Sequence, residues 1–164
     1  MASPPFIRAM HPKTEIRPEP VAVRKILNLG WIGQVKVHGH RAQIHIPADP
    51  KKQIVVYNRH GQPHRKKLPD ALDKELRRIF GPHDDWTVLD AEWLKDKDKI
   101  YVFDLLKLNG QSLRTYTYKE RWELLPRVYR SDNIETLPVL RSVDECMETL
   151  ASTDDRVEGL CGVD

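Results

Sequence analysis

The sequence has no apolar run that approaches the roughly 20 residues needed by a membrane-spanning helix. Its opening stretch, M-A-S-P-P-F-I-R-A-M, also lacks the apolar core of a secretory signal. With 40% hydrophobic and 31% charged residues in a chain of 164, the composition is typical of a globular protein. We therefore expect an intracellular protein with no membrane partner.

Cysteine is also scarce. Cys146 and Cys161 are the only two, and they stand too far from other candidate ligands to form a disulfide framework or a zinc-ligand pattern. His38, His40 and His45 are close in sequence, but no cysteine or carboxylate accompanies them in a metal-ligand spacing. We therefore expect buried or half-buried thiols and surface histidines rather than a transition-metal site.

Acidic residues are nearly missing between residues 36 and 67. Asp49 is the single acid there, against eight lysines and arginines, and five of the seven histidines lie in the same stretch. This stretch, called the basic window below, would attract a polyanion such as nucleic acid or a nucleotide triphosphate. A solvated basic face without a ligand is the alternative that charge alone leaves open.

The chain has room for one domain with a core, or for two small lobes that share one. Five prolines within residues 1–20 predict an extended N-terminal arm. In residues 21–164, apolar residues at every second position predict strands, and apolar residues at helical spacing predict helices. The expected strands or hairpins cover residues 34–46, 54–57, 86–94, 100–108 and 157–163. The expected helices cover residues 21–27 and 68–80, with one more from Thr117 to about Tyr129, bent or shortened by Pro126, and another from Ser142. This pattern predicts an α+β fold in which helices pack against antiparallel β-sheets.

Lys36 stands in the segment V-K-V-H-G-H-R. A lysine in a strand is normally a surface residue. Here Gly39 removes a side chain where a ligand could approach, and Arg41 offers a planar donor fork for phosphate or ribose oxygens. A lysine amine becomes a nucleophile when burial or neighbouring positive charge favours its neutral form.

The segment K-V-H-G-H-R resembles the K-x-D-G-x-R motif of the covalent nucleotidyltransferases. These are the ATP-dependent DNA ligases, the RNA ligases and the mRNA-capping guanylyltransferases. Later segments resemble further motifs of that family, in the order in which the family has them. They are V-Y-N-R-H-G (56–61), W-T-V-L-D-A-E-W-L (86–94), Y-V-F-D-L-L-K-L-N-G (101–110), L-R-T-Y-T-Y-K-E-R-W-E-L-L (113–125) and V-E-G-L-C-G-V-D (157–164). The resemblance runs from residue 31 to residue 164, and the DNA-ligase branch fits best.

This resemblance implies an adenylation-domain fold over residues 21–164 and the activity of an ATP-dependent DNA ligase. Lys36 would attack the α-phosphate of ATP and retain AMP as a lysyl-AMP phosphoamide while pyrophosphate leaves. The AMP would then pass to the 5′-phosphate at a nick in double-stranded DNA, which the 3′-hydroxyl attacks.

The resemblance also implies roles for the other motif residues. Arg41 and Arg59 would contact ribose and phosphate, Phe103 would stack on the base, and Glu92 and Glu158 would hold Mg²⁺ or ribose. Taken singly, each has a plainer explanation. Phe103 would be a core residue, Glu92 part of the polar face of a strand, and Arg59 an exposed turn residue.

Three residues depart from the family pattern. One is Ala91, which replaces the glycine of the D-G-E motif, a small change that a strand can absorb. His38 replaces the motif aspartate and sets a neutral or cationic ring beside the nucleophile in place of an anion. Val163 stands where the last motif has a lysine. The family's final K-x-K strand and its OB-fold domain have no counterpart in the sequence, so we expect an unpaired sheet edge.

These departures leave several interpretations open. The chain is a fragment, or it is completed by another chain or domain that supplies the missing strand and OB-fold. Alternatively, it is a non-catalytic ligase-like module that binds nucleotide or nucleic acid. An RNA ligase or a capping-type nucleotidyltransferase is the remaining alternative.

Overall fold

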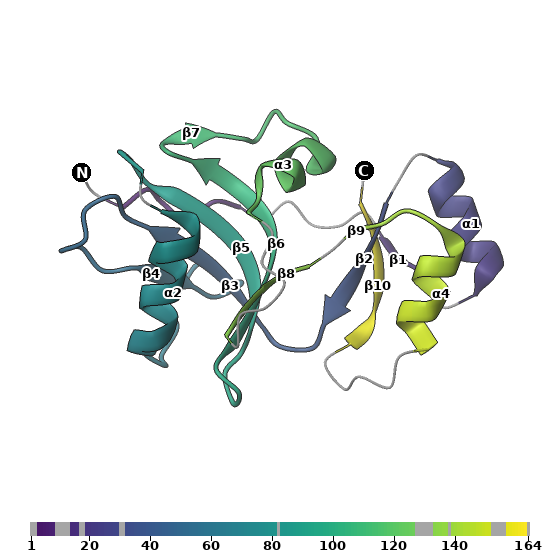
Figure 1. Cartoon of the computed structure of the whole chain (residues 1–164), viewed down its shortest axis with the longest axis horizontal. Helices are drawn as coiled ribbons and strands as arrows, with labels where there is room; N and C mark the ends of the chain where they lie inside the picture. Colours follow the sequence, from purple (N-terminus) through teal and green to yellow (C-terminus); the bar gives the residue numbers. More distant parts are fainter. Residues whose placement is uncertain are drawn as a thin grey trace. The chain divides into compact units, whose positions relative to one another are not determined.

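The computed structural model of the chain describes residues 3–8, 14–16, 19–29, 32–81, 83–126, 133–137, 139–151 and 157–163. For residues 14–16, 35–36, 150–151 and 157–163 it describes the backbone alone. The chain forms two compact units (Figure 1). Unit 1 consists of Met1–Ala9 and Gly39–Thr136, and unit 2 consists of Met10–His38 and Leu137–Asp164. The expected division at residue 20 stays a prediction.

Unit 1 contains a six-stranded sheet in the order β4-β3-β5-β6-β7, with β8 paired to β6. Its strands are β3 (His40–Ile46), β4 (Val55–Tyr57), β5 (Thr87–Leu94), β6 (Lys99–Leu108), β7 (Gln111–Ser112) and β8 (Ile134–Thr136). Every pair is antiparallel except β6 with β8, which is parallel. The central strands β5 and β6 are largely buried on both faces, as their nearly continuous apolar sequences require.

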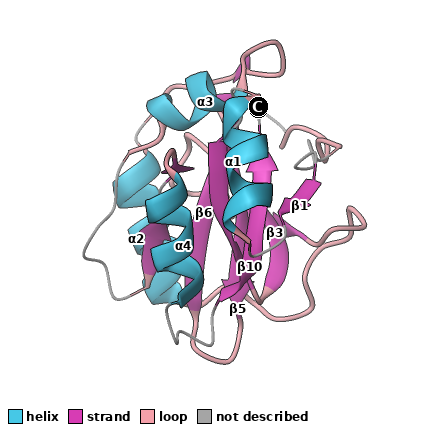
Figure 2. Ribbon diagram, turned by 90° about the vertical axis from the view of Figure 1, so that its right-hand side faces the viewer, coloured by secondary structure: helices cyan, strands magenta, loops and turns pink. Residues whose placement is uncertain are grey.

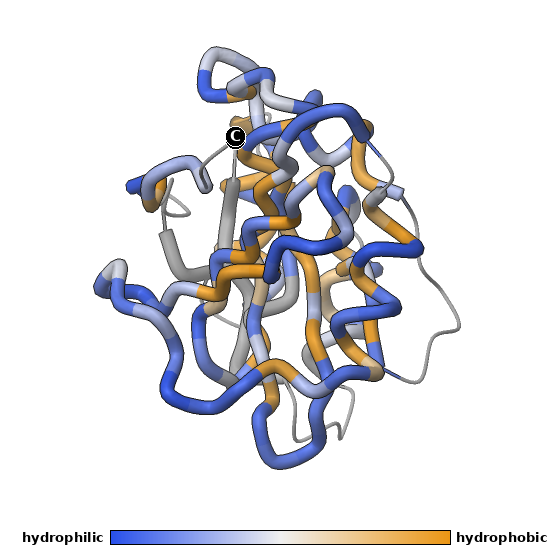
Figure 3. The backbone as a smooth tube through the Cα atoms, turned by 90° about the vertical axis from the view of Figure 1, so that its left-hand side faces the viewer, coloured by the Kyte–Doolittle hydropathy of each residue, from blue (hydrophilic) through white to orange (hydrophobic). Residues whose placement is uncertain are grey.

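Helix α2 (Asp70–Phe80) packs on this sheet (Figure 1). Its buried residues are Leu72, Leu76 and Phe80, which recur every fourth position and so share one face of the helix. Their burial anchors the helix, while Arg77 and Arg78 on its last turn bind Asp73 and Glu75. Figure 3 shows apolar residues concentrated in the strands and helices and hydrophilic residues in the loops.

Helix α3 (Tyr118–Leu124) begins with the expected capping box. Thr117 Oγ1 accepts a hydrogen bond from the backbone N–H of Glu120, and the Glu120 carboxylate accepts one from the backbone N–H of Thr117. The helix ends before Pro126, whose ring disfavours helical geometry at the preceding residue. α3 lies against β6, which places the buried Arg121 beside the sheet.

Unit 2 contains a four-stranded antiparallel sheet in the order β1-β10-β2-β9. Its elements are β1 (Thr14–Ile16), α1 (Pro20–Asn28), β2 (Ile32–Val37), β9 (Val139–Leu140), α4 (Val143–Ala151) and β10 (Val157–Val163). Helices α1 and α4 lie side by side (Figure 2), and Val23, Leu140 and Cys146 form the buried centre of their contact. The thiol of Cys146 is thus a core group, as expected.

The predicted α+β class is confirmed, and the predicted helices and most predicted strands have structural counterparts. Among the described residues, no helix is long and apolar enough to cross a membrane.

Three expectations are corrected. The edge of β10 is not unpaired, because β1, from the predicted N-terminal arm, pairs with it. The expected strand or hairpin over residues 34–46 is two strands of different sheets, since β2 pairs with β10 and β9 whereas β3 pairs with β4 and β5. His45, expected at the surface, is fully buried. His38 and His40 are exposed as expected.

Candidate active site

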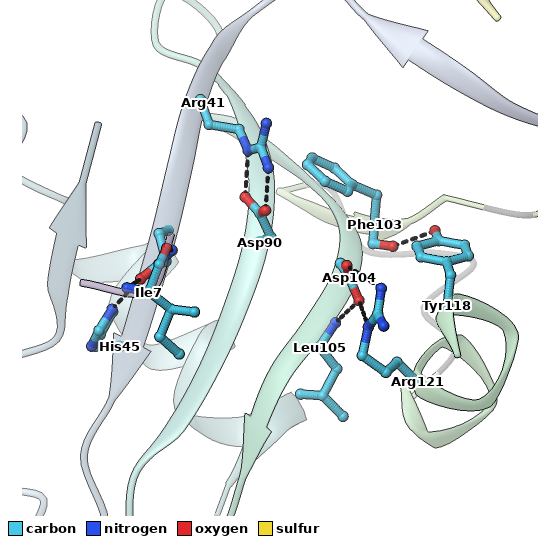
Figure 4. Close-up of polar contacts among 10 residues, drawn as sticks. Ile7, Arg41, His45, Asp90, Phe103, Asp104, Leu105, Tyr118 and Arg121 are labelled. Atoms are coloured by element: carbon cyan, nitrogen blue, oxygen red, sulfur yellow. Dashed lines mark hydrogen bonds and ion pairs between the residues drawn. The ribbon is translucent and has the colours of Figure 1, made fainter. Parts of the chain in front are cut away.

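Arg41 and Asp90 form a bidentate ion pair in unit 1. The antiparallel register of β3 and β5 sets Arg41 opposite Glu92 and one diagonal step from Asp90. Arg41 Nε donates to Asp90 Oδ1 at 2.5 Å, and Arg41 Nη2 donates to Asp90 Oδ2 (Figure 4). Asp90 is almost completely buried, whereas Arg41 keeps 17% of its side chain exposed. Asp90 therefore fixes the guanidinium, and part of the Arg41 side chain stays exposed.

The environment of Arg41 is acidic. Burial disfavours the charged guanidinium, but the hydrogen bond to Asp90 and the negative charge of Asp90 oppose that effect. The negative charges of Glu92 and Asp104 also favour the charged guanidinium. Together these interactions raise the pKa of Arg41 above its ordinary value. Arg41 is thus a permanent cation held among three carboxylates.

Phe103 lies beside this cation because of a β-bulge. The register of β5 and β6 shifts between Asp90, which pairs with Asp104, and Ala91, which pairs with Val102. Phe103 falls between those two partners, and a bulge re-aims the side chain that it carries. The guanidinium carbon of Arg41 lies 5.0 Å from the centroid of the Phe103 ring, within cation–π range (Figure 4). Phe103 is half-buried, unlike its fully buried neighbours on β6.

Asp104 is the next carboxylate along β6, and α3 neutralises it. Arg121 Nε donates to Asp104 Oδ1 at 2.8 Å, and Arg121 Nη2 donates to Oδ2 at 3.1 Å. Burial of Asp104 outweighs the bonds from Arg121 and raises the pKa of this carboxyl to about 6. From the same helix, the Tyr118 hydroxyl donates to the Phe103 carbonyl at 2.5 Å (Figure 4). Helix α3 thereby stabilises the bulge that carries Phe103.

Gly39 brings backbone close to the Glu92 carboxylate. A Cβ atom added to Gly39 would lie 3.0 Å from the Trp93 carbonyl oxygen and 3.3 Å from Glu92 Oε2. No side chain fits there without displacing one of these groups. The motif glycine therefore has a steric reason in this fold, which is close approach to β5.

Arg59 lies on the exposed turn that follows β4. Asn58 Oδ1 accepts hydrogen bonds from the backbone N–H of His60 at 2.9 Å and of Gln62 at 3.0 Å. Gly61 closes the turn with φ of +77°, a left-handed conformation that favours glycine. The turn presents the Arg59 side chain to solvent, where its Nε donates to His60 Nε2 at 3.2 Å.

Lys36 and Glu158 belong to unit 2, on neighbouring strands. Lys36 of β2 pairs with Gly159 of β10. The β10 register shifts between Val157 and Gly159, so Glu158 also falls at a bulge. The backbone thus brings these two motif residues to adjacent positions within one sheet.

The predicted site residues accordingly form two groups. Arg41, Glu92 and Phe103 come together in unit 1, with Arg59 on a turn of the same unit, while Lys36 and Glu158 neighbour one another in unit 2. The motif K-V-H-G-H-R itself spans the boundary, which falls between His38 and Gly39. The catalytic and binding roles of all six residues stay predictions.

Sequence reasoning missed the partners of these residues. It gave Asp90, Asp104 and Arg121 no site role, although all three lie inside motif segments. It also missed His64, whose Nε2–H donates to the Arg41 carbonyl at 2.8 Å. The signal for Asp104 was its position beside Phe103. Nothing in the sequence pointed to His64.

The two carboxylates expected to hold Mg²⁺, Glu92 and Glu158, lie in different units. Within the described part of the chain, no three His, Cys, Asp or Glu side chains form a group able to hold a metal ion. Carboxylate oxygen is nonetheless the donor type that Mg²⁺ prefers, and the half-buried Glu92 offers one beside the Gly39 backbone. The donor chemistry at Glu92 therefore fits the ion.

Comparisons with known proteins find a likeness in fold but none in sequence. No protein-family model matches the chain, and no curated protein matches it either. Among solved structures, the chain is similar to the ligase domain of LigD from M. tuberculosis, with a TM-score of 0.50 and 18% sequence identity. The likeness covers 80% of this chain but only 48% of the other, so the chain spans about half the length of that structure. Identity this low shows the fold alone, which is an α+β fold shared with that ligase domain.

Proposed function

We propose that this chain is the nucleotidyltransferase part of an ATP-dependent DNA ligase, with Lys36 as its nucleophile. The observation that carries the proposal is the assembly of Arg41, Glu92 and Phe103 on three adjacent strands. They come from three motif segments that are far apart in sequence. A fold likeness that covers most of the chain supports the same reading.

The proposed reaction begins at the Lys36 amine. The neutral Nζ forms a bond to the α-phosphorus of ATP, the bond from that phosphorus to the bridging oxygen breaks, and pyrophosphate leaves with the electron pair. The amine loses a proton to solvent, and AMP remains on Lys36 as a phosphoamide. The 5′-phosphate of a DNA nick then accepts the AMP and frees Lys36.

Unit 1 would bind the nucleotide. The half-buried Phe103 ring is available to stack on the base, and the fixed guanidinium of Arg41 would bind ribose oxygens. The exposed Arg59 would contact phosphate. Glu92 and Glu158 would hold Mg²⁺, which when bound would neutralise the charge of the polyphosphate.

Nicked double-stranded DNA is the proposed partner. The basic window places Arg59, Arg65, Lys66 and Lys67 on exposed positions of unit 1, where cations would neutralise backbone phosphates. Lys66 also bonds Asp98 at 2.6 Å, so it is the least available of the four. Since the chain spans about half of the LigD ligase structure, we propose that a further domain or chain completes DNA binding.

The deciding experiment measures covalent AMP. The protein is incubated with ATP and Mg²⁺, and its intact mass is recorded. We expect an AMP adduct in the wild type and in the control Lys51→Ala, which removes an exposed lysine of the same window, but none in Lys36→Ala. Loss of the adduct only in Lys36→Ala identifies the nucleophile. GTP in place of ATP tests the capping-type alternative.

No adduct in the wild type, with either Mg²⁺ or Mn²⁺, would contradict the enzyme proposal. The variant His38→Asp restores the acidic residue that the family motif has at that position. If only this variant forms the adduct, His38 is what disables the site.

A non-catalytic ligase-like module is the second candidate. The observation that favours it is His38, which stands beside Lys36 in place of the acceptor-only aspartate of the family's lysine motif. In that case calorimetry would show ATP binding while mass spectrometry shows no adduct. The two measurements together separate a binding module from an enzyme.

A further inference from the structure

The N-terminal segment Ser3–Arg8 lies on the sheet of unit 1. β3 alternates polar and apolar residues, and such a strand normally exposes its polar face. Here Gln43 and His45, two polar residues of β3, are buried. The segment accounts for this burial, since Gln43 Oε1 accepts from Ile7 N–H at 2.8 Å and Gln43 Nε2 donates to the Ile7 carbonyl at 2.7 Å (Figure 4). The Gln43 amide thus binds the segment as a neighbouring strand would.

A second contact joins the segment to the turn that carries Arg59. The Phe6 ring meets the Tyr57 ring edge to face, with centroids 5.8 Å apart. A Cβ atom added to Gly61 would lie 3.1 Å from Phe6 Cδ1. The Phe6 ring therefore packs directly on the backbone of the turn, at the position where φ is +77°.

The side chains that the segment contacts also contact one another. Tyr57 also meets the buried His45 ring edge to face, at 4.9 Å between centroids, and His45 Nε2 lies 2.8 Å from Gln43 Oε1. Phe6 and Ile7 are thus connected through one cluster to β3 and β4, and β4 leads directly into the turn. Displacing the segment would uncover Gln43, His45 and Tyr57 and would remove the packing from one side of Gly61.

We propose that the N-terminal segment positions the turn Asn58–Gln62, so that Arg59 is held ready for a phosphate. Phe6 is a positioning residue in this proposal, because it acts through the turn and contacts no ligand itself. The proposal rests on the proposed function only for the identity of the ligand of Arg59. The mechanical part, that Phe6 orders the turn, stands on the contacts alone.

The first test needs no ligand. Backbone N–H order parameters of the full chain are measured by NMR for wild type, Phe6→Ala and Phe6→Tyr. We expect the Arg59, His60 and Gly61 values to fall from about 0.85 to below about 0.6 in Phe6→Ala, while β5 stays rigid and Phe6→Tyr behaves as wild type. Leu124→Ala, which trims an exposed leucine of α3 in the same unit, is the matched control. An unchanged turn in Phe6→Ala overturns the proposal.

The second test couples Phe6 to Arg59 through the affinity for ATP with Mg²⁺. If Arg59 binds phosphate through a charge-assisted bond, Arg59→Ala weakens binding by roughly tenfold or more. Phe6→Ala should weaken it several-fold in the wild type but less than about twofold in the Arg59→Ala background, because coupled residues are not additive. An equal effect of Phe6→Ala in both backgrounds would assign Phe6 a general structural role and refute positioning.

The two tests separate the two proposals. If the wild type binds no ATP, the proposed function fails, and the order parameters still decide whether the segment holds the turn. If ATP binds but the turn is as rigid in Phe6→Ala as in the wild type, only the positioning proposal fails.

Discussion

Two buried groups of unit 1 should give stability opposite dependences on pH. Burial, reinforced by the charge of Lys107, lowers the pKa of His45 to about 4, from an ordinary value of 6.5. Between those two values the unfolded chain binds the proton and the folded protein does not. The His45 contribution to the free energy of unfolding is therefore complete above pH 6.5 and is lost as the pH falls toward 4.

Asp104 gives the free energy of unfolding the opposite dependence on pH. Its pKa is raised from 3.8 to about 6, chiefly by burial, so in that window the folded protein holds a proton that the unfolded chain has released. Its contribution is complete below pH 3.8 and is lost as the pH rises through 6. The windows of His45 and Asp104 overlap almost completely.

The magnitudes nearly cancel in the wild type. One pKa unit corresponds to about 1.4 kcal/mol, so each group accounts for roughly 3 kcal/mol over its full window. Between about pH 4.5 and about pH 6, linkage gives a rise of about 2 kcal/mol from His45 and a fall of about 2 kcal/mol from Asp104. These two groups together should leave the stability of unit 1 almost flat in that range.

Single substitutions separate the two contributions. His45→Gln removes the contribution that makes stability rise with pH. We therefore expect its free energy of unfolding, compared with that of the wild type, to decrease as the pH rises from about 4.5 to about 6. Asp104→Asn removes the contribution that makes stability fall with pH, so its free energy of unfolding should increase over the same range relative to the wild type. His60→Gln and Asp96→Asn remove exposed groups of the same kinds and serve as controls.

The assay is urea unfolding followed by tryptophan fluorescence at a series of pH values. Three of the four tryptophans, Trp86, Trp93 and Trp122, belong to unit 1, so the signal reports mainly on that unit. The quantity compared is the change in unfolding free energy between the two ends of the pH range. Parallel curves for wild type, His45→Gln and Asp104→Asn would refute the reasoning, because neither group would then titrate differently in the folded and unfolded states.

Two further predictions concern the hairpin of β6 and β7 and the basic window. Asn109 and Gly110 both have positive φ, +47° and +81°, in a two-residue loop, and a Cβ on Gly110 would overlap the Asp85 carboxylate. Gly110→Ala should therefore lower the free energy of unfolding by about 1–3 kcal/mol in the same assay. Charge reversal by Arg65→Glu with Lys67→Glu should weaken gel-shift binding to a nicked duplex and flatten its salt dependence, since fewer counterions are released. Lys74→Glu with Lys119→Glu reverses two exposed cations of unit 1 outside the window and is the matched control. Equal binding by both double variants would mean that the window is only a solvated face.

Local signals in the sequence predicted many element positions closely. The capping spacing of Thr117 and Glu120 marked the start of α3, because it acts through atoms only a few residues away. The end was predicted less closely, since α3 ends at Leu124, about five residues before the expected end. The four-residue spacing of Leu72, Leu76 and Phe80 likewise predicted α2. Such signals depend on backbone geometry that a short segment sets by itself.

Pairing between distant segments was not predictable in this way. β2 and β3 are separated by two residues yet join different sheets, and β8 adds to β6 in parallel. β1 covers an edge that was expected to be unpaired. These outcomes depend on which strand edges meet after the chain has crossed between its two units.

The sequence by itself determined the α+β class, the local elements and the motif order that nominated Lys36, Arg41, Arg59, Glu92, Phe103 and Glu158. The tertiary structure decided what surrounds the motif residues of unit 1. It paired Arg41 with Asp90, turned Phe103 toward that cation at a bulge, and buried His45 beneath the N-terminal segment. The physical reason is that charge pairing, bulges and burial depend on neighbours contributed by other strands. The spacing of residues along one strand does not reveal these neighbours.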